Sequence, residues 1–69
     1  MNIYGYTEGS DELLKLINLT IQVDENELRR LAQFFLKCAE SIDSDDWEHE
    51  HLSDFLNDMS FKPDIIVAK

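Results

Sequence analysis

The sequence is poor in basic residues and cysteine, and has no long apolar run. Six Lys and Arg stand against fifteen Asp and Glu, for a formal net charge of −9. A surface of that sign repels nucleic acid and anionic lipid, so we expect neither as a partner. The single cysteine, Cys38, excludes an intramolecular disulfide, and its helical apolar surroundings favour a small core residue. Without a signal peptide or a run long enough to span a bilayer, a cytoplasmic protein is expected.

The chain is also short, and its length bounds its chemistry. We expect the 69 residues, 1–69, to form a single domain. A core of that size leaves a net stability of roughly 3–5 kcal/mol and little room for a deep active site. The sequence has no Gly-rich phosphate loop and no CxxC motif. We therefore predict no catalytic residues, no cofactor and no enzymatic activity.

Alternation of apolar and polar residues predicts two strands in the first third of the chain. Residues 3–7 are rich in strand-forming side chains. Over residues 17–23 apolar and polar positions alternate, which is typical of a strand with one buried face in an antiparallel sheet. The apolar positions are Ile17, Leu19, Ile21 and Val23.

Residues 25–42 carry the strongest helical pattern. Asp24 can cap the first turn, and Glu27 stands where it completes a capping box. Apolar residues recur every three or four positions around Phe35, which we expect in the core. This wide stripe needs a sheet to cover it. Its members are Leu28, Leu31, Ala32, Phe35, Ala39 and Ile42, widened by Phe34, Leu36 and Cys38.

The remaining residues complete the predicted architecture. Residues 43–46 are an acidic turn, residues 47–52 alternate as a third strand, and residues 53–59 suggest a helical turn. Residues 64–68 are apolar on both faces, which favours a strand in the interior of the sheet. The prediction is an α+β fold: a small, mostly antiparallel sheet in the order ββαββ, with one amphipathic helix packed on one face.

His49 and His51 form the one pair of residues that suggests a metal. Two positions apart in a strand, their imidazoles would lie on the same face. Zinc needs three or four protein ligands, and only a distant carboxylate such as Asp54 could add to the pair. We therefore expect no metal site and interpret both as local hydrogen-bonding or contact residues.

The strongest functional pattern is acidic. Seven carboxylates and no Lys or Arg fall between Asp43 and Asp58, with Trp47 inside the window. Charge can steer a basic protein partner and a buried aromatic can anchor it. The alternatives are a solvated edge strand and a Trp47 that fills the core. The partner-binding candidates are Asp45, Asp46, Trp47, Glu48, His49, Glu50, His51 and Asp54, with Glu48 and Glu50 on an exposed strand face.

Three segments resemble the Immunity protein 32 family of bacterial polymorphic toxin systems. They are the helix over residues 24–39, the run Trp47-Glu48-His49-Glu50-His51-Leu52 and the ending Pro63-Asp64-Ile65-Ile66-Val67. The tryptophan followed by Glu-His-Glu-His is the most specific of them. The resemblance implies a cytoplasmic antidote that binds and blocks a cognate toxin.

The hypothesis is therefore an immunity protein that neutralises a toxin, such as a basic nuclease, by occluding it with an acidic surface. One alternative is a structural or regulatory homo-oligomer without a toxin, and a lesser one is a His-based metal-binding module. The sequence also suggests a homodimer, because one helix covers only one sheet face. The other face would expose Tyr4, Tyr6 and the neighbours of Ile66, and exposed area of that kind marks a contact surface.

Overall fold

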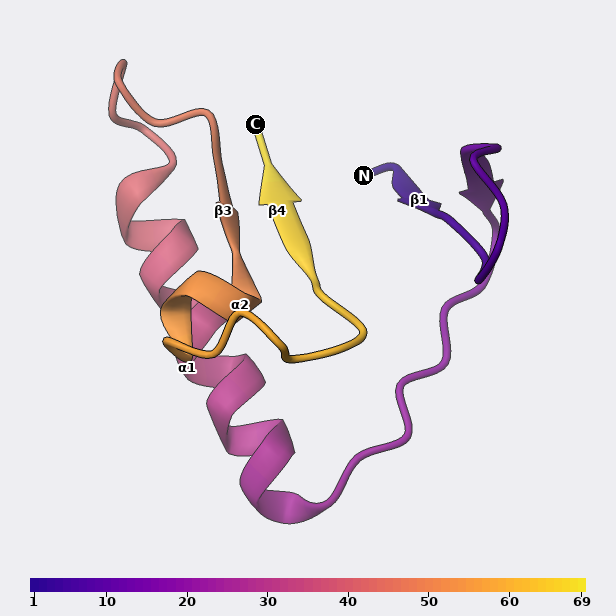
Figure 1. Ribbon diagram of the computed structural model, residues 1–69. Coiled ribbons are helices and arrows are strands. Elements are labelled where there is room, and N and C mark those ends of the chain that lie inside the picture. The colour runs from indigo at the N-terminus through magenta and orange to yellow at the C-terminus, as the bar shows by residue number, and fades with distance from the viewer.

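One long helix and two separate two-stranded sheets make up the protein, as a computed structural model of all 69 residues shows (Figure 1). Strand β1 (Ile3–Gly5) pairs antiparallel with β2 (Leu14–Leu16), and β3 (His49–His51) pairs antiparallel with β4 (Ile66–Ala68). Helix α1 (Glu25–Ser41) separates the sheets in sequence, and the short helix α2 (Leu52–Phe55) follows β3. The predicted α+β class, with two strands on either side of one main helix, is confirmed.

Helix α1 begins where the sequence places it because its first turn is fixed locally. The Glu27 amide donates to Asp24 Oδ1 over 2.8 Å, and the Asp24 amide donates to Glu27 Oε1 over 3.3 Å. This reciprocal capping box satisfies two of the amide groups that the first turn leaves without helical partners. The helix ends at Ser41, with Ile42 as its C-cap.

The core is small and lies between α1, α2 and the β3–β4 sheet. Its buried side chains are those of Leu31, Phe34, Cys38 and Leu52. Partly buried side chains from Val23, Trp47, Phe55, Leu56, Phe61, Ile65 and Val67 pack around them. Burial raises the pKa of the Cys38 thiol, which disfavours a reactive thiolate and agrees with its predicted place in the core.

Phe35 was predicted in the core, and that prediction is wrong. Phe34 is fully buried at 0% exposure, whereas Phe35 is 44% exposed. The wide stripe assumed a sheet broad enough to cover both side chains. The β3–β4 pair has only two strands, so it covers the narrower line of Leu31, Phe34 and Cys38.

The strand predicted over residues 17–23 is also absent. Strand β2 ends at Leu16, and residues 17–23 continue as an extended connection whose backbone forms no hydrogen bond. A strand needs a neighbour, and neither two-stranded sheet lies against this segment. For the same reason the last strand is not interior: β4 pairs with β3 alone.

The β1–β2 hairpin stands apart from the buried core, to which it contributes no side chain (Figure 1). The single domain over residues 1–69 therefore stays a prediction. Neither helix has the length and apolar character that a bilayer span requires.

Candidate partner-binding surface

The turn after α1 presents the acidic residues. Ser44 and Trp47 donate backbone hydrogen bonds to the carbonyls of Ser41 and Ser44, over 3.0 and 3.1 Å, which folds the turn tightly. Five exposed carboxylates from this turn, the residue before β3 and α2 form no side-chain hydrogen bond and no ion pair: Asp43, Asp45, Asp46, Glu48 and Asp54. One cationic side chain, that of Lys69, lies next to the turn, where its Nζ donates a hydrogen bond to the Ser44 carbonyl over 3.0 Å.

Glu50 does not share the exposure of Glu48. Its side chain is 18% exposed, pairs with Lys37 of α1, and accepts a 3.0 Å hydrogen bond from the Trp47 indole. The hydrogen bond from Lys37, followed by that from Trp47, holds the pKa of Glu50 below its ordinary value. Glu50 therefore ties β3 to α1, and the expectation of an exposed position for it is wrong.

Trp47 has a structural role as well. It is half-buried and packs against the core cluster, with its indole N–H satisfied by Glu50. The indole thus fills the edge of the core, which is the second of the two interpretations that the sequence left open.

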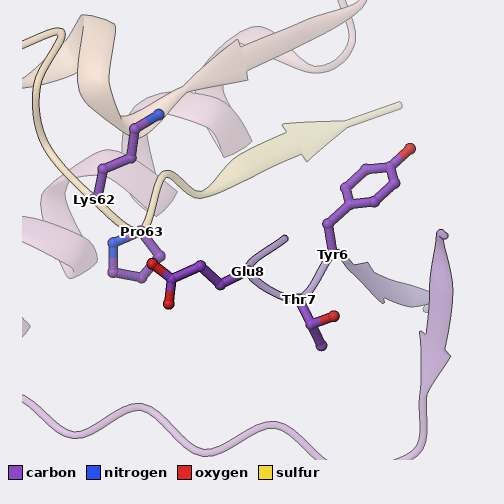
Figure 2. Close-up of a pocket in the computed structure, with 5 residues that line it drawn as sticks. All are labelled: Tyr6, Thr7, Glu8, Lys62 and Pro63. Atoms are coloured by element: carbon purple, nitrogen blue, oxygen red, sulfur yellow. The ribbon is translucent and has the colours of Figure 1, made fainter. Parts of the chain in front are cut away.

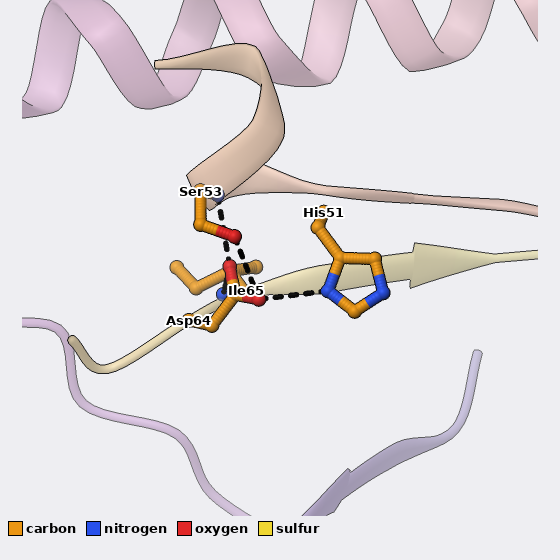
Figure 3. A network of polar contacts seen from close by, with 4 residues as sticks. All are labelled: His51, Ser53, Asp64 and Ile65. Atoms are coloured by element: carbon orange, nitrogen blue, oxygen red, sulfur yellow. Dashed lines mark hydrogen bonds and ion pairs between the residues drawn. The ribbon is translucent and has the colours of Figure 1, made fainter. Parts of the chain in front are cut away.

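The most connected polar group in the molecule is Asp64, two residues before β4 (Figure 3). Its Oδ2 lies 2.7 Å from His51 Nδ1 and accepts from Ser53 Oγ over 3.1 Å. Its Oδ1 accepts the backbone amides of Ser53 over 2.9 Å and Ile65 over 3.0 Å. One carboxylate thereby fastens the start of β4 to the junction between β3 and α2.

This Ser-His-Asp group does not have the arrangement of a nucleophilic triad. In a triad the hydroxyl bonds to the imidazole, which accepts its proton. Here the Ser53 hydroxyl bonds to Asp64, and no hydrogen bond joins it to His51. Desolvation raises the pKa of Asp64, but the hydrogen bonds from His51 and Ser53 together hold it below its ordinary value. The group is arranged to keep a carboxylate charged and to brace the fold.

Ser53 and Asp64 were not among the predicted site residues, although the sequence held a signal for them. In the observed register His49 faces Ala68 and His51 faces Ile66. Continued by two residues, that antiparallel register places Ser53 opposite Asp64. Pairing the two predicted strands in this register would have brought Asp64 to Ser53 and, diagonally, to His51.

His49 and His51 lie on one face of β3, as their spacing predicts, with ring centroids 5.3 Å apart. No group of three or more His, Cys, Asp or Glu side chains is placed to hold a metal ion. Asp54 is not brought to the histidine pair, and His51 uses Nδ1 for Asp64.

The predicted surface is not hollowed into a pocket. An open pocket of about 590 Å³ lies between the hairpin turn and the loop before β4, lined by Tyr6, Thr7, Glu8, Lys62 and Pro63 (Figure 2). A larger groove lies between the hairpin and β4. Neither is lined by any of the eight partner-binding candidates. Small molecules bind mainly in concave sites, so a surface of this shape suits a protein partner better.

Comparison with known proteins assigns the family. No curated protein and no solved structure matches the chain. A family model described as Immunity protein 32 matches residues 18–69, which include α1, β3, α2 and β4 and leave out the β1–β2 hairpin. The match spans well over half of the chain and contains the acidic turn and the Asp64 network. The chain belongs to the Immunity protein 32 family.

Proposed function

We propose that this protein is the antidote of a bacterial polymorphic toxin system and that it blocks its toxin by occupying the toxin's functional surface. Family membership supports an immunity role. The observation that carries the mode of binding is the set of five exposed, unpaired carboxylates around the acidic turn. Unpaired charges are free to form new pairs, so such a surface attracts a basic partner without first breaking internal ones.

The partner-binding candidates have two different roles in this proposal. Asp45, Asp46, Glu48 and Asp54 would contact the toxin directly, with the exposed His49 beside them. Trp47, Glu50 and His51 hold β3 in place through contacts within the chain. A nuclease is the toxin class that this surface fits best, because carboxylates can occupy the positions where its basic site holds phosphates.

In this proposal the protein acts by binding alone, in the cytoplasm, without a cofactor or metal. The Asp64 network is then a structural device that keeps the acidic turn and β3 in register. The association should be fast and sensitive to salt, since exposed charges are screened over about 8–10 Å at physiological ionic strength.

The test is reversal of the unpaired charges. The triple variant Asp45→Lys, Asp46→Lys, Glu48→Lys should slow association with the toxin encoded beside this gene and abolish protection of cells that express the toxin. Glu50 is left unchanged because its reversal would break the pair with Lys37. Circular dichroism should show an intact fold, since the three side chains have no internal partners.

The matched control carries the same change in net charge elsewhere. Glu8→Lys, Asp11→Lys and Glu12→Lys lie in the exposed loop of the hairpin, outside the residues that match the family. This variant should still protect cells and bind the toxin with a comparable dissociation rate. Full protection by the first variant, or equal loss in both, would show that the acidic turn is not the interface.

A further inference from the structure

An apolar groove separates the β1–β2 hairpin from the rest of the protein. It has a volume of about 1500 Å³, with β1 along one wall, β4 along the other, and Leu31, Phe35 and Phe61 among the residues between them. The accessible surface of the chain is 6108 Å². A compact protein of this mass exposes about 4,500 Å², so roughly 1,600 Å² remains uncovered that folding ordinarily buries. That surplus is about twice the roughly 800 Å² that each partner buries in an interface of standard size.

The wall formed by β4 is an open strand edge. Toward β3, the Ile65 carbonyl accepts from Leu52 over 2.7 Å, the Lys69 amide donates to Glu48 over 3.0 Å, and Val67 faces Glu50. Backbone groups alternate between the two edges of an antiparallel strand. Those of Ile66 and Ala68 therefore point away from β3 and toward the groove, where no strand meets them. An unpaired edge of this kind is a template for an added strand.

The chain also contains a strand-like segment that it does not use. Residues 17–23 have the alternation of a half-buried strand, yet their backbone forms no hydrogen bond. Three of their four apolar side chains are exposed, Ile17 at 95%, Leu19 at 55% and Ile21 at 43%, while Val23 packs against the core cluster. Each copy therefore has one vacant strand position and one unused strand.

Residues 19–23 line the groove in their own chain, but their backbone forms no hydrogen bond there. In the hairpin, β1 is the strand nearer to β4 and β2 lies beyond it (Figure 1). Residue 17 follows the end of β2 directly. Because the segment continues from β2, on the far side of β1, pairing with β4 of its own chain would require it to cross the end of β1.

Charge favours a second copy over a basic toxin. The groove includes Arg30, Lys62 and Lys69, half of the six cationic side chains in the sequence, against the two carboxylates of Glu27 and Asp64. Residues 17–23 are followed by Asp24 and Glu25 and preceded by Asp11, Glu12 and Lys15. An apolar strand with mainly acidic flanks complements an apolar groove whose side chains carry a net positive charge, whereas a basic partner would be repelled by that groove.

We propose that two copies associate by reciprocal exchange, in which residues 17–23 of each add as a strand to the free edge of β4 in the other. The exchange closes on itself, so it gives a dimer and not a filament. It joins the two small sheets of each copy across the added strand and leaves the acidic turn uncovered. The inference does not depend on the toxin, and its test needs none.

The first measurement is the mass in solution of the full-length protein. Sedimentation at increasing concentration should give a species of twice the 8.1 kDa chain mass. Leu19→Lys should raise the dimer dissociation constant by at least about tenfold, because it would place an unpaired ammonium group in the apolar groove. The control is Leu36→Lys, the same substitution at a residue that is 65% exposed and lies outside the groove. It should leave the dimer unchanged.

The second measurement locates the contact. In a mixture of the single variants Ile21→Cys and Ile66→Cys, a short bis-maleimide should yield a cross-linked pair that contains one chain of each. The parent protein, whose only thiol is the buried Cys38, is the control. The proposal is overturned by a monomer at high micromolar concentration, or by a dimer that lacks this cross-link.

Discussion

Phe34 and Phe35 are adjacent and chemically identical, yet the structure gives them opposite roles, and this contrast is directly testable. Phe34 is fully buried, with its ring centroid 5.6 Å from that of Phe55. Phe35 lies on the groove side of α1 and is 44% exposed. Replacing each in turn by the same smaller residue tests which of the two side chains lies in the core, because the chemical change is the same at both positions.

The expected effects differ severalfold. Truncating a fully buried Phe to Ala costs about 3–5 kcal/mol, which equals the whole stability of roughly 3–5 kcal/mol that a domain of this size has. Phe34→Ala should therefore leave most molecules unfolded at room temperature. Phe35→Ala gives up only part of a burial free energy of about 1.5–3 kcal/mol, so a loss near 1 kcal/mol is expected.

Urea denaturation followed by circular dichroism measures both losses. Phe34→Leu and Phe35→Leu form a milder pair, which keeps the comparison measurable if Phe34→Ala does not fold. Midpoints are taken at dilutions where they no longer depend on protein concentration, so that self-association does not contribute. A larger loss at Phe35 than at Phe34 would refute the assigned orientation of α1 and restore the wider apolar stripe that the sequence suggests.

Two further changes test the polar contacts that hold the fold. Asp64→Asn should destabilise the protein by about 1–3 kcal/mol at neutral pH, since it removes the charge from the acceptor of four hydrogen bonds. In the folded protein the pKa of Asp64 lies below its ordinary value of 3.8. Its contribution to the stability is therefore present above that pH and is lost as the pH falls through the folded pKa. The urea midpoints of parent and variant should converge on acidification. Asp24→Ala should cost about 1 kcal/mol through loss of the capping box, and thermal melts in which Asp24→Asn retains most of the stability would identify the cap as the cause.

What the sequence predicted well is what neighbouring residues determine. The start of α1 depends on Asp24 and Glu27, three residues apart, and the structure forms the capping box that their spacing indicates. The shared face of His49 and His51 follows from strand geometry alone. Immunity protein 32 membership, inferred from three short segments, is confirmed over residues 18–69.

What the sequence missed depends on pairing between distant residues. The inward position of Glu50 depends on its ion pair with Lys37 of α1, which lies 13 residues earlier in the chain. The Asp64 network needs the register of β3 with β4. Which side of α1 is buried depends on the width of the sheet that covers it. The periodicity of the helix alone therefore does not distinguish Phe34 from Phe35.

Over residues 17–23 a strong local pattern and the structure of a single chain disagree. Exposed apolar residues beside an open strand edge invite uncontrolled association, and proteins commonly cover or charge such edges. Here the edge residues Ile66 and Ala68 carry no charge. The net charge of −9 opposes association of the whole molecule but does not protect this edge in particular. Reciprocal exchange removes the exposed segment and the open edge together, in a contact that ends at two copies. The alternation in residues 17–23 then has a physical purpose that a single chain does not satisfy.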